Sequence, residues 1–383
     1  MAEPDPRRTR RVGGTIHGGL NYDARLSRLR GRIAAAGADA LLVTGLSNIR
    51  YLTGFAGSAG VLIVSAAGCA LLVDGRYEEI VRGGQTAGSI APVDVVRVKK
   101  YDTAILEQLT SGGWAAVAFE ADHTPVSQHR RWLDGLRHVE WKPTSDLVES
   151  ARIVKDASEI AILRDAGRRL SDVARRIGEW VAIGRTELDI AGEVDRAIRQ
   201  AGFEKPAFDT IVATGPNTAY PHARPTDRRV QKGDLVLLDF GGVLEGYCVD
   251  LTRMAGAGRV SAEADSLYRA VRAAQDAAIA AVSPGVLSTE VDTAARQVLV
   301  QQELGSAFVH GTGHGLGLDV HEAPRVGQQD PSEATRLESG MVVTIEPGAY
   351  VVGLGGVRLE DDVLVTDEGR EVLTNAPRDL LTV

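Results

Sequence analysis

Cysteine is nearly absent from this 383-residue chain, which has only Cys69 and Cys248, one in each half. Two such distant cysteines provide no disulfide framework, so we expect a reducing compartment and a cytoplasmic protein. The first residues lack the apolar core of a signal peptide, and nowhere do 18 apolar residues run together. No membrane association is therefore expected.

An excess of positive charge is also lacking, because the formal net charge is −8. The small basic cluster at residues 7–11 precedes the first periodic segment and is interpreted as a solvated tail, so no nucleic-acid partner is expected. Residues 1–20 lack periodicity and are predicted to be poorly ordered. The remaining length is enough for two domains of ordinary size.

A phosphate-binding glycine fingerprint is missing too, since the segment Gly54–Gly60 resembles a flexible loop. Between residues 21 and 148, strand-like apolar runs alternate with helical stretches, which is typical of an α/β domain. The predicted helices are Tyr22–Ala36, Tyr77–Arg82, Ala104–Leu109 and Val126–Leu136, and the predicted strands are Ala40–Val43, Gly60–Val64, Ala70–Val73, Val93–Val98 and Ala115–Phe119.

A second domain is predicted over residues 149–383, because Lys142–Asp146 interrupts the alternation and a capped helix follows. Asp156 and Glu159 have the spacing of a capping box. A second helix is expected after a cap at Thr186. The apolar stripe of the first helix consists of Ile160, Leu163, Leu170, Val173, Ile177 and Val181.

This second half contains an internal repeat. The segment at residues 184–189 recurs approximately at residues 285–292, and each copy joins a long helix to a shorter one that leads into strands. The first expected hairpin spans residues 235–253. The second joins Met341–Glu346 to Val357–Val365 through glycines. Helix pairs followed by hairpins predict an α+β domain with a pseudo-two-fold axis.

Each expected hairpin carries two acids, Asp239 and Asp250 in the first and Glu346 and Glu360 in the second. A turn centred between residues 244 and 245 would set Asp239 directly opposite Asp250, roughly 5 Å away. A shifted register would leave them diagonal on the same face. Because unpaired buried charges are costly, we expect a cation between them. The alternative is two surface aspartates near a turn.

Four histidines lie in the same domain, at 222, 310, 314 and 321. The glycine-rich segment 310–321 disfavours a helix, so its backbone can approach a ligand or metal. Four carboxylates and an imidazole suit paired divalent ions, Mn²⁺ first, with Co²⁺ or Zn²⁺ possible. Two such ions can hold a bridging water and promote its attack on a carbonyl, which predicts hydrolysis.

The five residues Asp239, Asp250, His314, Glu346 and Glu360, together with the motifs at residues 346–350 and 356–361, resemble the pita-bread metallopeptidases. That family includes aminopeptidase P, prolidase, methionine aminopeptidase and the related creatinase, and the resemblance extends from residue 22 to residue 365. It implies that Asp239 binds one metal ion, that His314 and Glu346 bind the other, and that Asp250 and Glu360 bridge both. Glu346 is also implied as the general acid–base.

The resemblance further implies that His222, His310 and His321 steady the substrate carbonyl and the tetrahedral intermediate. Arg358 lies two residues before Glu360, so it shares that strand face and can support the acidic cluster. The alternative for Arg358 is an ordinary surface ion pair.

The N-terminal half resembles the creatinase/prolidase-like domain of the proline-directed peptidases, which methionine aminopeptidases generally lack. All five ligand positions are present, which favours catalysis over a creatinase-like metal-free reaction or a binding function. We predict an Xaa-Pro aminopeptidase acting on peptides with proline at the second position, with Xaa-Pro dipeptidase as the alternative.

The two specificities differ in whether a basic group closes the site around the substrate's free carboxylate. The candidates for that group are Arg50, Arg76, Arg224 and Arg325. The family also implies a homodimer in which the Gly54–Gly60 loop approaches the neighbouring active site. The alternative is an N-terminal domain that covers only its own subunit.

Overall fold

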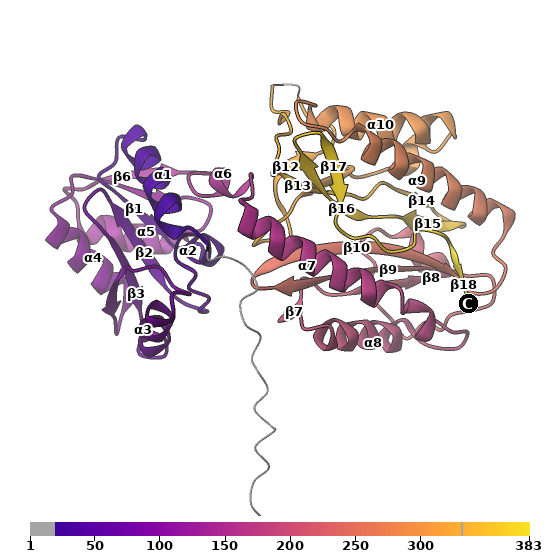
Figure 1. Ribbon diagram of the computed structural model, residues 1–383, viewed down its shortest axis with the longest axis horizontal. Helices are drawn as coiled ribbons and strands as arrows, with labels where there is room; N and C mark the ends of the chain where they lie inside the picture. The colour runs from indigo at the N-terminus through magenta and orange to yellow at the C-terminus, as the bar shows by residue number, and fades with distance from the viewer. Residues whose placement is uncertain (1–19, 331) are drawn as a thin grey trace, which may run out of the picture.

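The computed structural model describes residues 20–330 and 332–383, so the predicted tail lies outside the described residues except for Leu20. Figure 1 shows two lobes joined by the short helix α6 (Glu149–Arg152). The N-terminal lobe contains elements α1 to β6, and the C-terminal lobe contains α7 to β18. We keep a domain boundary between residues 148 and 149 as a proposal.

The N-terminal lobe is a six-stranded mixed sheet in the order β4-β3-β2-β1-β5-β6, with helices on both faces. Leu41 and Val43 of β1 pack toward α1 and α2, whereas Ala40 and Leu42 pack toward α4 and α5. Burial on both faces explains the continuous apolar runs of these strands. The elements are α1 (Tyr22–Ala35), β1 (Ala40–Val43), α2 (Leu46–Thr53), β2 (Val61–Ser65), β3 (Cys69–Val73), α3 (Glu78–Ala87), β4 (Asp94–Arg97), α4 (Tyr101–Gly112), β5 (Ala116–Glu120), α5 (Val126–Gly135) and β6 (Glu140–Thr144).

The predicted strands and helices of this lobe are all present, with ends shifted by up to five residues. Two elements were missed. Helix α2 places the polar Asn48 in a fully buried position, which breaks the expected apolar stripe. Strand β6 contains Pro143, which is tolerated because β6 lies at the edge of the sheet.

The C-terminal lobe confirms the predicted repeat of helix pairs. Its helices are α7 (Ala157–Ala174), α8 (Glu187–Gln200), α9 (Ala262–Ala281) and α10 (Ser288–Gln301). Capping boxes at Asp156 and Thr186 begin α7 and α8 as expected. The α7 helix ends before Ile177, which is buried in a separate 3₁₀ turn (Ile177–Glu179). The two linkers are built alike, since Gly184 donates to Val230 O and Gly285 donates to Leu337 O.

Two five-stranded sheets and one two-stranded ribbon fill the space between these helix pairs, as Figure 1 shows. Helices α7 and α8 share a core with the first sheet, and α9 and α10 share a core with the second. None of the helices in the described part of the chain combines the length and apolarity that crossing a bilayer requires. The strands are β7 (Lys205–Pro206), β8 (Ile211–Thr214), β9 (Leu235–Leu244), β10 (Tyr247–Gly256) and β18 (Leu381–Thr382) in the first sheet, β11 (Gly313–Gly315), β12 (Glu322–Val326), β13 (Val342–Ile345), β16 (Asp361–Thr366) and β17 (Gly369–Val372) in the second, and β14 (Gly348–Val351) and β15 (Gly355–Arg358) in the ribbon.

The first hairpin, β9–β10, corrects the expected register. Its two-residue turn is Glu245-Gly246, with φ of 48° and 87°, as a type I′ turn requires. Asp250 therefore pairs with Gly241, and Asp239 pairs with Thr252. Direct opposition of the aspartates was wrong because the turn lies one residue later than expected. The diagonal alternative is correct and keeps both side chains on one face.

A single hairpin was expected from Met341–Glu346 to Val357–Val365. The structure instead interrupts it at Pro347. Strand β13 pairs with β16, while β14 pairs with β15 in a separate ribbon. Ile345 is opposite Asp361 and Gly348 is opposite Arg358, so both halves share one register, which puts Glu346 opposite Glu360 at the junction. The break occurs where proline has no N–H to donate to a ladder.

Replacing Gly246 by alanine tests the turn that sets the position of the two aspartates. We expect Gly246→Ala to destabilise the protein by about 1–2 kcal/mol, because a Cβ is unfavourable at positive φ. That Cβ would also lie 2.2 Å from Cζ of Arg50, which must move. Gly83→Ala is the control, since Gly83 lies in α3 with open space around its Cβ position. Urea unfolding should show Gly83→Ala to be neutral or stabilising by up to about 1 kcal/mol. An equal effect of both changes would contradict the assigned turn.

Candidate active site

A cavity of about 480 Å³ in the C-terminal lobe contains every site residue predicted from the sequence. The lining residues from that set are His222, Asp239, Asp250, His310, His314, His321, Glu346, Arg358 and Glu360. They come from both hairpins and from the glycine-rich segment, so the fold gathers side chains that lie more than 100 residues apart in sequence.

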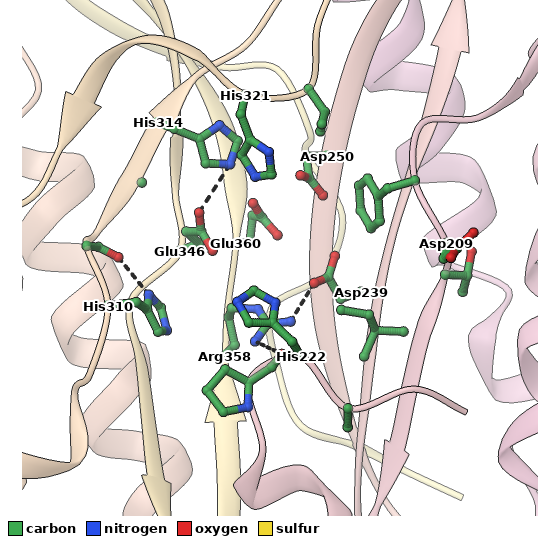
Figure 2. A pocket seen from close by; sticks show the side chains of 18 of the residues that line it. Asp209, His222, Asp239, Asp250, His310, His314, His321, Glu346, Arg358 and Glu360 are labelled. Carbon is green, nitrogen blue, oxygen red and sulfur yellow. Dashed lines mark hydrogen bonds and ion pairs between the residues drawn. The ribbon is translucent and has the colours of Figure 1, made fainter. Parts of the chain in front are cut away.

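The four carboxylates face one another in the middle of this cavity (Figure 2). One ligand atom each from Asp250, His314 and Glu360 lies within 4.8 Å of the others. Oδ1 of Asp239 and Oδ1 of Asp250 are buried without a hydrogen-bond partner. A buried acceptor without a partner is costly, and a bound cation would satisfy both oxygens. The residues present therefore fit divalent metal ions.

The electrostatics of the cluster point the same way. Burial, followed by repulsion from neighbouring carboxylates, raises the pKa values of Asp250 and Glu360 well above those of ordinary acids. Burial also raises the pKa of Glu346, although Arg358 opposes this shift. Cations placed among these carboxylates would stabilise their ionised forms and remove the repulsion between them.

His314 is held in the form that binds metals. Burial lowers its pKa to about 4, so the ring is neutral near pH 7. Its Nδ1 lies 3.0 Å from Gly315 O, which assigns the proton to Nδ1 and leaves a lone pair on Nε2. That Nε2 is 3.3 Å from Oε1 of Glu346. Two electron-rich atoms so close together suit a shared cation.

Arg358 is not a surface ion pair, so that alternative is wrong. It is only 3% exposed, and its Nη2 pairs with Oδ2 of Asp239. Its Nη1 donates to the hydroxyl of Tyr350 at 2.8 Å and to Pro221 O at 3.1 Å. The guanidinium therefore fixes one carboxylate and supplies positive charge at the edge of the cluster.

Tyr350 connects Arg358 to His310 and was missed as a site residue. Nδ1 of His310 lies 2.7 Å from Gly311 O, so Nε2, at 2.9 Å from the Tyr350 hydroxyl, accepts its hydrogen bond. Tyr350 is opposite Gly356 in the ribbon, two positions from Arg358. Side chains two positions apart share a strand face, so Tyr350 lies diagonally across the ribbon from Arg358, a relation that only the strand register reveals.

Two threonines that bind the acids, Thr252 and Thr344, were also missed. The Thr252 hydroxyl donates to Oε2 of Glu360 at 2.6 Å, and the Thr344 hydroxyl donates to Oε1 of Glu346 at 3.3 Å. Thr252 follows Asp250 by two residues, and Thr344 precedes Glu346 by two. The period of two along each strand places each threonine on the same face as an acid.

His222 and His321 lie on the solvent-exposed side of the acid cluster. The ring of His321 packs edge-on against that of His314, with ring centroids 4.3 Å apart. His222 lies on the other side, beside Asp239 and Arg358 (Figure 2). Within the described residues neither ring has a hydrogen-bond partner, so both are free to contact a ligand in the cavity.

The glycines on either side of His314 also have a packing role that was not expected. A Cβ at Gly313 would lie 1.9 Å from Thr344 O, and one at Gly315 would lie 2.1 Å from Ala323 O. Only glycine fits, because β11 is packed tightly between β12 and β13. These two glycines therefore allow close strand packing, which fixes the position of His314, and Gly313 also lines the cavity, where its backbone can approach a ligand.

Two family models match the chain. Metallopeptidase family M24 matches residues 161–367, and the Creatinase/Prolidase N-terminal domain matches residues 25–154. An Xaa-Pro dipeptidase of Pyrococcus furiosus is 36% identical over 287 residues, covering 75% of this chain and 80% of that protein.

Solved structures agree with these matches. The Xaa-Pro dipeptidase from Bacillus anthracis has a TM-score of 0.89 at 34% identity and covers 95% of this chain and 100% of its own. The X-Pro aminopeptidase from Thermotoga maritima has a TM-score of 0.84 at 30% identity, with 94% and 100% covered. This chain therefore belongs to metallopeptidase family M24, with a creatinase/prolidase-type N-terminal domain and a pita-bread domain that makes it a metal-dependent hydrolase.

Proposed function

We propose that this enzyme cleaves the Xaa-Pro bond with two divalent metal ions held by Asp239, Asp250, His314, Glu346 and Glu360. The observation that carries the proposal is the cavity in which four carboxylates and a neutral imidazole converge, with two buried carboxylate oxygens lacking partners. Its oxygen-rich ligands, without thiolate, suit Mn²⁺ best, while Co²⁺ and Zn²⁺ are also compatible.

When bound, two such ions would lower the pKa of a water molecule and stabilise the oxyanion formed at the peptide carbonyl. Glu346 would take the proton of the attacking water and deliver it to the leaving proline nitrogen. His222 and His321 have ring nitrogens free to donate to the substrate carbonyl. Both ring nitrogens of His310 already have hydrogen-bond partners, Gly311 O and the Tyr350 hydroxyl. We therefore propose that His310 orients Tyr350, and through it Arg358.

The structure reduces the candidates for binding the substrate carboxylate from four arginines to two. Arg224 and Arg325 line the cavity, whereas Arg50 lines a neighbouring cavity between the lobes. Arg76 forms an exposed ion pair with Asp74. Arg325 is the better candidate, because it stands opposite His314 on β12, whereas Arg224 lies in a loop; neither has a hydrogen-bond partner among the described residues.

A guanidinium at that position can bind the free carboxylate of a dipeptide's proline with two hydrogen bonds. Xaa-Pro dipeptidases from Pyrococcus furiosus and Bacillus anthracis are 36% and 34% identical to this chain. Arg325 and these relatives favour the dipeptidase alternative over the aminopeptidase prediction. We therefore propose Xaa-Pro dipeptides as the preferred substrates.

Comparing Ala-Pro with Ala-Pro-Ala tests this specificity. We expect the Mn²⁺-loaded enzyme to have at least about tenfold higher kcat/KM for the dipeptide, because only a dipeptide places its carboxylate next to its proline ring.

Arg325→Met should lower dipeptide kcat/KM roughly 10- to 100-fold by removing charge-assisted hydrogen bonds, mainly through KM. Arg224→Met is the matched control and should have a smaller effect. Efficient tripeptide cleavage that Arg325→Met leaves unchanged would support the aminopeptidase prediction instead.

Asp250→Asn tests the metal ligands. The change removes the charge of a proposed bridging residue, so we expect bound metal to fall by at least one ion per chain and kcat to fall more than about 100-fold. Asp209→Asn is the control, because Asp209 is an exposed carboxylate lining the same cavity (Figure 2). Atomic absorption and dipeptide hydrolysis measure both effects. Full activity after exhaustive chelation would contradict the metal mechanism.

We retain the homodimer as a proposal, with one change to its expected geometry. Ala56 and Gly57 of the glycine-rich loop line the cavity between the two lobes of their own chain, beside His321. This agrees with the alternative in which the N-terminal domain covers its own subunit. Static light scattering should give about twice the 40.7 kDa chain mass at micromolar concentration, and the chain mass itself would rule out a stable dimer.

A further inference from the structure

The loop that carries His321 connects β11 to β12 and folds around its own acidic side chains. Gly317 N donates to Asp319 O at 3.0 Å, and Asp319 N donates to Oε1 of Glu322 at 2.9 Å. A Cβ at Gly317 would lie 2.9 Å from both carboxylate oxygens of Glu322. Asp319 and Glu322 stand on either side of His321 in sequence, so whatever fixes their carboxylates also fixes the histidine.

Arg152, from the helix between the lobes, binds both of these carboxylates. Its side chain is only 4% exposed, and Nη2 lies 2.7 Å from Oδ2 of Asp319 and also pairs with Oε1 of Glu322. Lys155 Nζ, also buried, lies 3.7 Å from Oε2 of Glu322. The loop is thus held by two cations that belong to neither of the hairpins carrying the acid cluster.

The N-terminal lobe in turn holds Arg152. Its Nη1 donates to Oδ1 of Asn48 at 2.7 Å, and the Asn48 amide donates to Oε1 of Glu120 at 2.7 Å. Ser47, the residue before Asn48 in α2, donates directly to Oδ1 of Asp319 at 2.5 Å. Helix α2 therefore reaches the His321 loop by two routes, one through Arg152 and one through Ser47.

We expect this network, which is buried at Asn48, Arg152 and Lys155 and half-exposed at Asp319, to specify geometry more than to add stability. Desolvation of the charges offsets most of their attraction. The planar guanidinium, however, donates hydrogen bonds to carboxylates only in a narrow range of orientations. The His321 ring has no hydrogen bond of its own among the described residues. Its orientation therefore depends on the loop backbone and on its contact with His314.

We propose that Arg152, seated by Asn48 and assisted by Ser47, is a positioning residue that orients His321 toward the substrate carbonyl. The N-terminal lobe thereby takes part in the reaction through the loop between β11 and β12. This inference rests on the proposed function, because it assigns His321 to Xaa-Pro cleavage.

The competing explanation is that Arg152 only holds the two lobes together, and the chain offers a matched control. Arg25 in α1 is equally buried and also joins the lobes, through ion pairs with Asp156 and Glu159. It also donates to Tyr51 O, but among the described residues it makes no ion pair or hydrogen bond with the His321 loop. Loss of either arginine weakens contact between the lobes, and only loss of Arg152 releases the loop.

The kinetic test compares Arg152→Met with Arg25→Met, using Ala-Pro and the Mn²⁺-loaded enzyme. We expect Arg152→Met to lower kcat roughly 10- to 100-fold with a smaller change in KM, since a displaced catalytic group costs turnover. Arg25→Met should keep kcat within about threefold of the wild-type value, even if its unfolding midpoint falls as far as that of Arg152→Met. In the His321→Ala background, Arg152→Met should have little further effect on kcat, because both changes act through one group. Independent, multiplicative losses, or equal losses in both arginine variants, would overturn the proposal.

A readout independent of activity uses ¹⁵N-histidine labelling. The ring signals of His321 are those lost in His321→Ala, and we expect them to shift or broaden in Arg152→Met but not in Arg25→Met. If Arg152→Met does not fold, Ser47→Ala replaces it, with the same ring signals affected and kcat lowered roughly two- to tenfold. Unchanged His321 signals would refute the positioning role. Failure of the wild-type enzyme to cleave Ala-Pro would refute the proposed function instead, while the ring signals would still decide the positioning.

Discussion

Mutual repulsion among four closely grouped carboxylates, of which Asp239, Asp250 and Glu360 are buried, is the constraint on which the C-terminal lobe depends. Within the described residues, Arg358 is the one cation that pairs directly with this cluster. The acids must therefore be held together by bonds that do not rely on their charge. Glu360 N donates to Thr252 O at 3.3 Å, and Asp250 N donates to Oδ2 of Asp362 at 3.0 Å. These bonds link β10 to the region of β16 and join the two sheets at the cluster.

The internal repeat explains how such a site is assembled, since each copy contributes one hairpin with two acids. The two copies differ in how their strands pair around the acids. The continuous first hairpin leaves Asp239 and Asp250 diagonal, and the break at Pro347 sets Glu346 opposite Glu360. An imidazole stands on one side of the cluster, near Glu346, and a guanidinium stands on the other, against Asp239. The two halves of the site are thus related by symmetry in their backbone and unlike in their charge.

Much of this could be predicted from the sequence, because it depends on local signals. Apolar runs, capping residues and the repeated linker fixed the order of elements, and the acids and histidines fall on the strands and loop that the pattern indicates. The register of the first hairpin could not be derived reliably, because it depends on which residues adopt positive φ. The turn at Gly246 differs from the expected one by a single residue.

The contacts between lobes could not be predicted for a different reason. Asn48, Glu120 and Arg152 look like ordinary surface residues in the sequence, since polar side chains are mostly exposed. Each is buried here because its partners come from other segments of the chain. Long-range polar networks of this kind leave no periodic signal. Their members become visible only when the fold brings the partners together.

The segment from Leu316 to Arg325 shows why the contact between lobes matters for the reaction. It holds His321, which faces the substrate carbonyl in the proposed function, and Arg325, which faces the substrate carboxylate, only four residues further on. Glu322, bound by Arg152, lies between them at the start of β12. The anchored carboxylate of Glu322 therefore acts on the adjacent His321, whereas Arg325 is placed by its pairing with His314 between β11 and β12. In the proposed function the acid cluster holds the metal ions, and the orientation of His321 over that cluster depends on the N-terminal lobe through Arg152 and Asn48.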